Sequence, residues 1–210
     1  MDRQRLRKIV VETVLAFEGL PYVVTGVSNR HIHLSREDAD ILFGAGYELT
    51  VMKPLYQPGE FACEETLRAV GPKGKIDKVR ILGPSRAATQ IELSLTDTFT
   101  LGVQCPVNLS GNLAQAGKIR LENPSKGTFV ERNCGIVAMR HIHLTPQTAG
   151  HHGLKDRQIV SLEYGEGLRA ITFGGVLLRV SPSFADEAHL DTDEANAGAI
   201  KTGDFGLIIP

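Results

Sequence analysis

The amino-acid sequence predicts a mainly β protein built from two similar β-domains, with a few short helices and an amphipathic helix at the N-terminus. From Tyr22 onward the chain consists of short β-rich runs separated by glycine-rich turns, which is typical of barrels or sandwiches rather than of a parallel sheet. The string Arg-His-Ile-His-Leu also occurs twice, at 30–34 and at 140–144. A repeated string of this kind indicates an internal duplication.

The first segment, 1–21, has the pattern of an amphipathic helix. Apolar residues from Leu6 to Phe17 recur at i, i+3, i+4 spacing between charged residues, and Gly19 and Pro21 end the pattern. Two interpretations remain open at this point. The helix either docks on its own domain or is a detachable segment that binds another protein.

The remaining elements are short. Ser35, with Asp38 three residues later, predicts the N-cap of a helix that ends at Phe43, and Thr145-Pro146 predicts a second helix at the equivalent place. A third helix is expected over 193–199. Candidate strands are 22–28, 30–34, 77–82, 89–94, 100–105, 118–121, 135–144, 158–163, 169–173, 176–181 and 205–209.

The repeat extends beyond the histidine string. In each half a short helix and a strand follow, and then a Pro-Ser pair, at 84–85 and at 182–183. Glu92 lies eight residues after the first of these prolines, and His189 lies seven residues after the second. We therefore expect two domains, at about 22–115 and 116–210, that face each other.

Composition excludes several classes of function. A chain of 210 residues with a net charge of −1 gives no electrostatic reason to expect a nucleic-acid or membrane partner. Its three cysteines are widely spaced, which suits a reducing cytoplasm better than a disulfide framework. The sequence contains neither an apolar run long enough to cross a membrane nor a secretory signal.

The histidine strings predict a metal site. Residues i and i+2 of a strand point to the same side, so His31 and His33 present two imidazoles together, as do His141 and His143. Zinc is the usual metal for such pairs. Glu92 and His189 bring the number of candidate ligands to six, which exceeds the four of a structural zinc site and favours two ions. A Glu92 side chain that faces solvent is the alternative.

Other charged residues allow two interpretations. Arg86 offers a planar fork suited to phosphate, or is an ordinary surface arginine. Lys73 and Arg80 belong to a basic stretch that is either a solvated face or a site for the phosphates of a nucleotide-like ligand.

A cupin is the competing interpretation of the first histidine string. Gly26, His31, His33, Glu37 and Gly44 approximate the first motif of these metal-binding barrels. Three features argue against it. The glycine spacing is one residue short, Glu37 falls in the expected helix, and glutamine stands at the equivalent position 147 of the second copy.

Taken together, the motifs resemble the propanediol-utilisation type of phosphotransacylase, the phosphate propanoyltransferases. The resemblance covers about 22–210 and is carried by the strings at 26–34, 57–59, 83–86, 89–92, 140–143 and 189–197. It implies two β-barrel domains with the active site between them. It also implies reversible transfer of a short acyl group, propanoyl or acetyl, from coenzyme A to phosphate, by direct attack of phosphate on the thioester.

The same resemblance implies residue roles. His31 and His33 would hold one zinc ion, and Glu92, His141, His143 and His189 a second. Arg86 would bind phosphate. Contacts with coenzyme A would fall at Val27, Ser28, Asn29, Lys73, Arg80 and Asn196.

The resemblance also bears on partners and location. In this family an N-terminal helix can direct the enzyme into a bacterial microcompartment, so 1–19 would bind shell proteins inside an otherwise cytoplasmic setting. A homodimer is left open. The rival functions are a cupin-like metal oxidoreductase or isomerase, a zinc thioesterase, and a non-enzymatic shell or scaffold protein with structural zinc.

Overall fold

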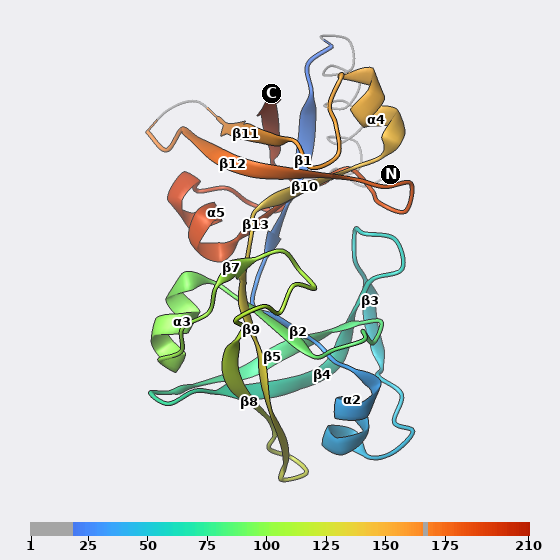
Figure 1. Ribbon diagram of the computed structural model, residues 1–210, viewed down its shortest axis with the longest axis vertical. Coiled ribbons are helices and arrows are strands. Elements are labelled where there is room, and N and C mark those ends of the chain that lie inside the picture. The colour runs from blue at the N-terminus through green and yellow to red at the C-terminus, as the bar shows by residue number, and fades with distance from the viewer. Residues whose placement is uncertain (1–18, 166–167) are drawn as a thin grey trace. The chain divides into compact units, whose positions relative to one another are not determined.

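A computed structural model describes residues 19–165 and 168–210 (Figure 1). The helix expected over 1–19 falls on residues 1–18, which lie outside the described part of the chain, and on Gly19, which is in a turn. The described chain is mainly β, as predicted. Its strands are β1 (Tyr22–Ser28), β2 (His31–His33), β3 (Val51–Pro54), β4 (Phe61–Val70), β5 (Lys75–Gly83), β6 (Gln90–Leu93), β7 (Val107–Asn108), β8 (Gly117–Asn123), β9 (Thr128–Ala138), β10 (His141–Leu144), β11 (Ile159–Tyr164), β12 (Ile171–Val180), β13 (Glu187–Asp191) and β14 (Phe205–Ile209).

The strands form two closed barrels. The first barrel is a ring in the order β4-β5-β2-β6-β9-β8, with β8 closing it onto β4 and with β3 and β7 attached to β4 and β9. The second barrel is a ring in the order β1-β13-β10-β12-β11-β14. Two compact units correspond to them. The first comprises Val27–Met139 and Leu190–Ala195, and the second comprises the described residues up to Gly26, Arg140–His189 and Asn196–Pro210.

The two barrels repeat the same strand pairing. The histidine strand β2 runs parallel to β5 and antiparallel to β6, and β10 runs parallel to β12 and antiparallel to β13. The register is equivalent as well, because His31 lies opposite Glu92 and His141 lies opposite His189. The internal duplication predicted from the sequence therefore extends to the hydrogen-bonded ladders.

The structure divides the chain differently from the consecutive ranges 22–115 and 116–210. Strand β1 precedes the first histidine strand but pairs with β13 and β14 of the second barrel. Strand β9 precedes the second histidine strand but pairs with β6 and β8 of the first barrel. Each repeat thus gives its leading strand to the barrel of the other repeat, and a boundary drawn along the sequence cannot follow such an exchange.

Four helices are described: α2 (Arg36–Phe43), α3 (Leu95–Leu101), α4 (Pro146–His151) and α5 (Thr192–Gly198). Three of them were expected. The N-caps of α2 and α4 are as predicted, because Ser35 accepts from the amide of Asp38 and Thr145 accepts from the amide of Thr148. These side chains satisfy amides that have no partner within the helix.

Helix α3 corrects the expected strand at 100–105. It begins with a capping box between Ser94 and Asp97, and it ends at Gly102, whose φ of 72° suits the left-handed conformation of a C-cap. Strands β4, β7 and β13 were missed. The expected strand 135–144 is two strands, since residues 139–140 separate β9 from β10.

The core of the first barrel explains why the histidine strand is held firmly. Ile32 and Leu34 are fully buried and pack with Ile81 and Ile91 from the two neighbouring strands. In the second barrel Ile142 and Leu144 are buried in the same way. The described helices include none long and apolar enough to cross a membrane.

Candidate functional site

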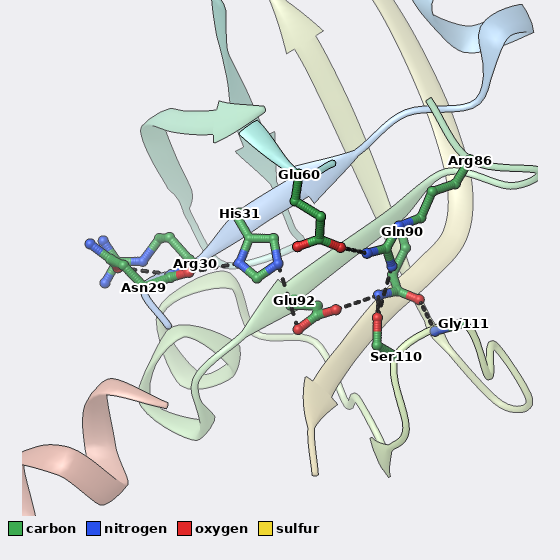
Figure 2. Close-up of polar contacts among 9 residues, drawn as sticks. All are labelled: Asn29, Arg30, His31, Glu60, Arg86, Gln90, Glu92, Ser110 and Gly111. Carbon is green, nitrogen blue, oxygen red and sulfur yellow. Dashed lines mark hydrogen bonds and ion pairs between the residues drawn. The ribbon is translucent and has the colours of Figure 1, made fainter. Parts of the chain in front are cut away.

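The first barrel brings His31, His33 and Glu92 together. One potential ligand atom from each of them lies within 4.8 Å of the others, and all three side chains are buried. The strand pairing explains this, because β2 places both imidazoles on one face and β6 places Glu92 directly opposite His31. Nε2 of His31 lies 3.6 Å from Oε2 of Glu92 (Figure 2).

The tautomer of the His31 ring follows from its neighbours. Its Nδ1 lies 2.8 Å from the backbone oxygen of Asn29, and because a carbonyl can only accept, Nδ1 carries the hydrogen and donates. In the neutral ring Nε2 therefore offers a lone pair, and it is Nε2 that faces Glu92. A backbone carbonyl that fixes the tautomer of an imidazole in this way is the usual support of a metal-binding histidine.

His33 offers a second free nitrogen. Its Nδ1 is buried and has no hydrogen-bond partner among the described residues. Burial, with the nearby His31 and Arg86, holds the pKa of His33 well below its usual range. The ring is therefore neutral at physiological pH. A buried neutral imidazole nitrogen without a partner is costly for the fold, and a metal ion would satisfy it.

The second barrel repeats the arrangement with His141, His143 and His189. The three rings lie with their centroids 4.7–4.8 Å apart. Nδ1 of His143 is again buried without a hydrogen-bond partner among the residues that the structure describes. Burial, with His141 and Arg179, lowers the pKa of His143 to about 3. Equivalent histidines in the two repeats thus leave the same nitrogen unsatisfied.

Glu187, which the sequence reasoning missed, faces His189. Its Oε2 lies 3.3 Å from Nε2 of His189. Gly26 lies against this carboxylate, and a Cβ at Gly26 would come within 2.3 Å of it, so a side chain there would displace the glutamate. The acidic residues after His189 act elsewhere, because Asp191 and Glu194 cap each other's amides at the start of α5.

Both clusters fit a zinc ion. Zinc prefers imidazole and carboxylate ligands, and a catalytic zinc site has three protein ligands and an open position. Each barrel supplies three such groups, and an unsatisfied buried nitrogen accompanies them. The family resemblance assigns Glu92 to the ion of the second cluster, and within the first barrel its carboxylate lies beside His31.

Arg86 lies in a polar network that leads to Glu92 (Figure 2). Its Nη1 donates to Oγ of Ser110 at 2.8 Å, and its Nη2 lies 3.3 Å from Oε1 of Glu60. Nε2 of Gln90 donates to Ser110 at 3.1 Å and to Oε1 of Glu92 at 2.6 Å. A cationic fork and a candidate metal carboxylate are therefore linked through two neutral side chains.

Gln90, Ser110 and Glu60 were not among the predicted site residues. Gln90 could have been found, since it lies two residues before Glu92 on the same strand and so shares its face. Glu60 and Ser110 lie on loops far from β6 in the sequence, and no local pattern identifies them.

The residues expected to contact coenzyme A are in part placed by the structure. Val27, Ser28 and Asn29 lead from β1 into the histidine strand, and the Asn29 carbonyl holds His31. Arg80 lies opposite His31 on β5 and donates from Nη1 to the carbonyls of Cys63 and Glu64. Lys73 and Asn196 are exposed, on the turn before β5 and on α5.

The cupin interpretation is not supported by the geometry. Glu37 is exposed in the first turn of α2 and does not join His31 and His33. The glutamate that does so is Glu92, from β6.

Fold and site together define a duplicated two-barrel protein in which each barrel carries a cluster of three candidate metal ligands, all buried in the first barrel and with His189 half-buried in the second. An arginine network lies beside the first cluster. The family model of phosphate propanoyltransferase matches residues 24–201. The phosphate propanoyltransferase of Thermotoga maritima is 50% identical over 189 residues, which cover 90% of each chain. That of Priestia megaterium is 47% identical over 99% of this chain and 97% of its own.

The chain belongs to the phosphate propanoyltransferase family, as the motifs of its sequence predicted. Membership identifies it as a transferase of the phosphate acyltransferase class.

Proposed function

We propose that this protein interconverts a short-chain acyl-coenzyme A and phosphate with an acyl phosphate and free coenzyme A, with propanoyl or acetyl as the acyl group. The observation that carries the proposal is the network in which the Arg86 guanidinium is joined, through Ser110 and Gln90, to the carboxylate of Glu92 beside His31. An anion-binding group and a candidate metal site are thereby held in one barrel. The family relationship supports the same chemistry.

Arg86 is proposed to bind phosphate. Its fork matches two phosphate oxygens, and its backbone amide, which donates to the carbonyl of Leu34 at 2.9 Å, ties the segment to the end of the histidine strand. A phosphate fixed in this way attacks in an effectively unimolecular step, which contributes up to about 7–11 kcal/mol in ideal cases. No nucleophilic side chain is required, so direct transfer without an acyl-enzyme is expected.

Two zinc ions are proposed as the resident metals. His31 and His33 would hold one ion, and His141, His143 and His189 the other, with Glu92 as a further ligand that the family resemblance assigns to the second ion. When bound, zinc would polarise the thioester carbonyl and stabilise the departing thiolate. The residues themselves orient two of these imidazoles, that of His31 through the Asn29 carbonyl and that of His189 through the Glu187 carboxylate.

Coenzyme A is proposed to contact Val27, Ser28, Asn29, Lys73, Arg80 and Asn196. The two cationic members suit its phosphate groups. Propanoyl and acetyl differ by one methylene, which a pocket distinguishes by only about 1–3 kcal/mol. Both thioesters are therefore proposed as substrates.

The test is release of free thiol from propanoyl-coenzyme A by the purified protein, with and without phosphate, together with metal analysis by mass spectrometry. Phosphate-dependent release with about two zinc ions per chain is expected from the metal-ligand sets above. Release that does not depend on phosphate would instead identify a zinc thioesterase. An absence of release would overturn the proposal.

The segment 1–19 is proposed to direct the enzyme to the shell proteins of a microcompartment. Its support is the amphipathic pattern of the sequence. Deletion of 1–19 is expected to leave turnover unchanged and to abolish co-purification with shells. Loss of turnover would show that the helix belongs to the fold.

A further inference from the structure

The orientation of the Gln90 side chain is fixed by one contact. The backbone amide of Gly111 donates to Gln90 at 2.7 Å (Figure 2). Since an amide N–H can only donate, the atom that it meets is the side-chain oxygen, and the side-chain NH₂ group must point the other way. It points to two groups, Oε1 of Glu92 and Oγ of Ser110. Both hydrogens of the Gln90 NH₂ group are therefore engaged in hydrogen bonds.

This arrangement determines where the Ser110 hydrogen points. Oγ of Ser110 receives one hydrogen bond from Nη1 of Arg86 and one from Nε2 of Gln90. Neither nitrogen can accept. Both lone pairs of the serine oxygen are thus occupied, and its own hydrogen must be donated to a third group.

Among the described residues no acceptor for the Ser110 hydrogen is found. Gln90 is buried and Arg86 is partly exposed, so Ser110 lies at the transition from the barrel interior to the accessible end of the arginine. A hydroxyl whose lone pairs are both occupied is an obligate donor. An anion bound at the adjacent guanidinium would supply the acceptor that it lacks.

We propose that Ser110 is a phosphate-binding residue whose hydroxyl donates to an oxygen of the phosphate held by Arg86, and that Gln90 is the positioning residue that aims it. This inference rests on the proposed function and adds a neutral, directional donor to the phosphate site. The site would then bind phosphate through the guanidinium of Arg86 and through the Ser110 hydroxyl, whose orientation as a donor is fixed by its two other hydrogen bonds.

The decisive variant is Ser110→Ala, measured in steady-state assays with propanoyl-coenzyme A and phosphate. A hydrogen bond to a charged group contributes enough that the KM for phosphate should rise about 10- to 100-fold. The KM for propanoyl-coenzyme A and the zinc content should not change. Ser110→Thr keeps the hydroxyl and should restore most of the phosphate affinity, and Ser125→Ala, on an exposed turn, is the matched control.

A double variant distinguishes direct binding of phosphate by Ser110 from an effect of Ser110 on the position of Arg86. In an Arg86→Lys chain, addition of Ser110→Ala should raise the KM for phosphate further if the hydroxyl contacts phosphate itself. No further change in that background would overturn the proposal, because Ser110 would then act only through the arginine. An equal rise of both KM values in Ser110→Ala would overturn it as well.

Failure of the inference and failure of the proposed function are distinguishable. Wild-type protein without phosphate-dependent thiol release would reject the function before any variant is made. Should Ser110→Ala lose zinc or fail to fold, Ser110→Cys keeps a group of similar shape that is only a weak donor. That variant should show the same selective loss of phosphate affinity, and normal phosphate affinity in it would contradict the proposal.

Discussion

The two barrels have the same topology and the same histidine strand, yet the residues around their histidines differ. Arg86 and Phe184 occupy equivalent positions, each two residues after the proline of its Pro-Ser pair. Arg86 enters the polar network of Ser110 and Gln90. Phe184 stacks on His143 with 3.9 Å between ring centroids and an angle of 7° between the planes. Both barrels contain the cluster of candidate metal ligands, while only the first barrel carries an arginine at this position.

A second difference concerns the strand opposite the histidines. Gln90 and Glu92 of β6 correspond in register to Glu187 and His189 of β13. The first cluster therefore contains a carboxylate and the second contains three imidazoles. A neutral amide supports the carboxylate, and a carboxylate supports the imidazole. In each barrel the supporting group complements the ligand that it contacts, which indicates that ligand and support changed together.

The largest effect is expected from substitution of Arg86, a position at which the two barrels differ. Arg86→Ala should lower kcat/KM for phosphate about 100- to 1,000-fold, because a charged donor to the reacting phosphate is lost, and should leave the zinc content unchanged. Phe184→Leu should change the KM for phosphate less than about threefold, since it removes no anion-binding group. The exposed Arg36→Ala is the control for loss of an arginine. If Phe184→Leu weakened phosphate as strongly as Arg86→Ala, the functional asymmetry of the barrels would be wrong.

Metal analysis tests the feature that the two barrels share, which is the cluster of three candidate metal ligands. His33→Ala and His143→Ala should each lower the zinc content by about one ion per chain, because each removes one member of a three-residue set. Mass spectrometry of the purified proteins measures this. Exposed His151→Ala should retain both ions. If both ions were lost in either variant, the two clusters could not be separate sites.

Glu92 can be assigned with a double variant. His31→Ala with His33→Ala should leave one ion, and the addition of Glu92→Gln should remove much of that remainder if the glutamate serves the second ion, as the family resemblance implies. Retention of the remaining ion would place Glu92 with His31, where it lies within the first barrel. Metal analysis at a fixed zinc concentration compares the double variant with the triple variant.

Much of the fold was predictable because it is encoded locally. The i, i+2 histidines, the caps at Ser35 and Thr145, and the duplicated string depend on neighbouring residues, and the structure confirms all three. The exchange of β1 and β9 between barrels was not predictable, because pairing partners distant in sequence leave no local pattern. The same reason hid Ser110 and Glu60, which reach Arg86 from separate loops.

The next prediction concerns a strand–helix contact that both barrels contain with its residues interchanged. In the first barrel Asp38 on α2 accepts from Thr89 before β6 and from Arg132 on β9. In the second, Asp186 before β13 accepts from Thr148 on α4 and from the amide of Thr145. The aspartate lies on the helix in one barrel and beside the strand in the other.

Burial decides which aspartate matters more. Asp38 is buried and Asp186 is partly exposed, so we expect Asp38→Ala to lower the free energy of unfolding by about 3 kcal/mol and Asp186→Ala by about 1 kcal/mol. Urea denaturation of both variants measures the difference. Glu163→Ala, at an exposed position of β11 in the second barrel, is the control. A larger loss for Asp186→Ala would contradict the role given to burial.

The smallest effect is a pH dependence that both barrels should share in the metal-free protein. The pKa values of His33 and His143 are lowered in the fold, that of His143 to about 3, mainly by burial. The unfolded chain binds protons near pH 6.5 while the folded chain does not, so stability is greatest above that pH and is lost as the pH falls toward 3. The slope approaches about 1.4 kcal/mol per pH unit for each histidine. Denaturation midpoints of chelator-treated protein at pH 7, 6 and 5 measure it. His33→Gln and His143→Gln should each remove about half of the slope that these two histidines contribute together. A slope that survives intact in either variant would show that its barrel does not hold a buried neutral imidazole.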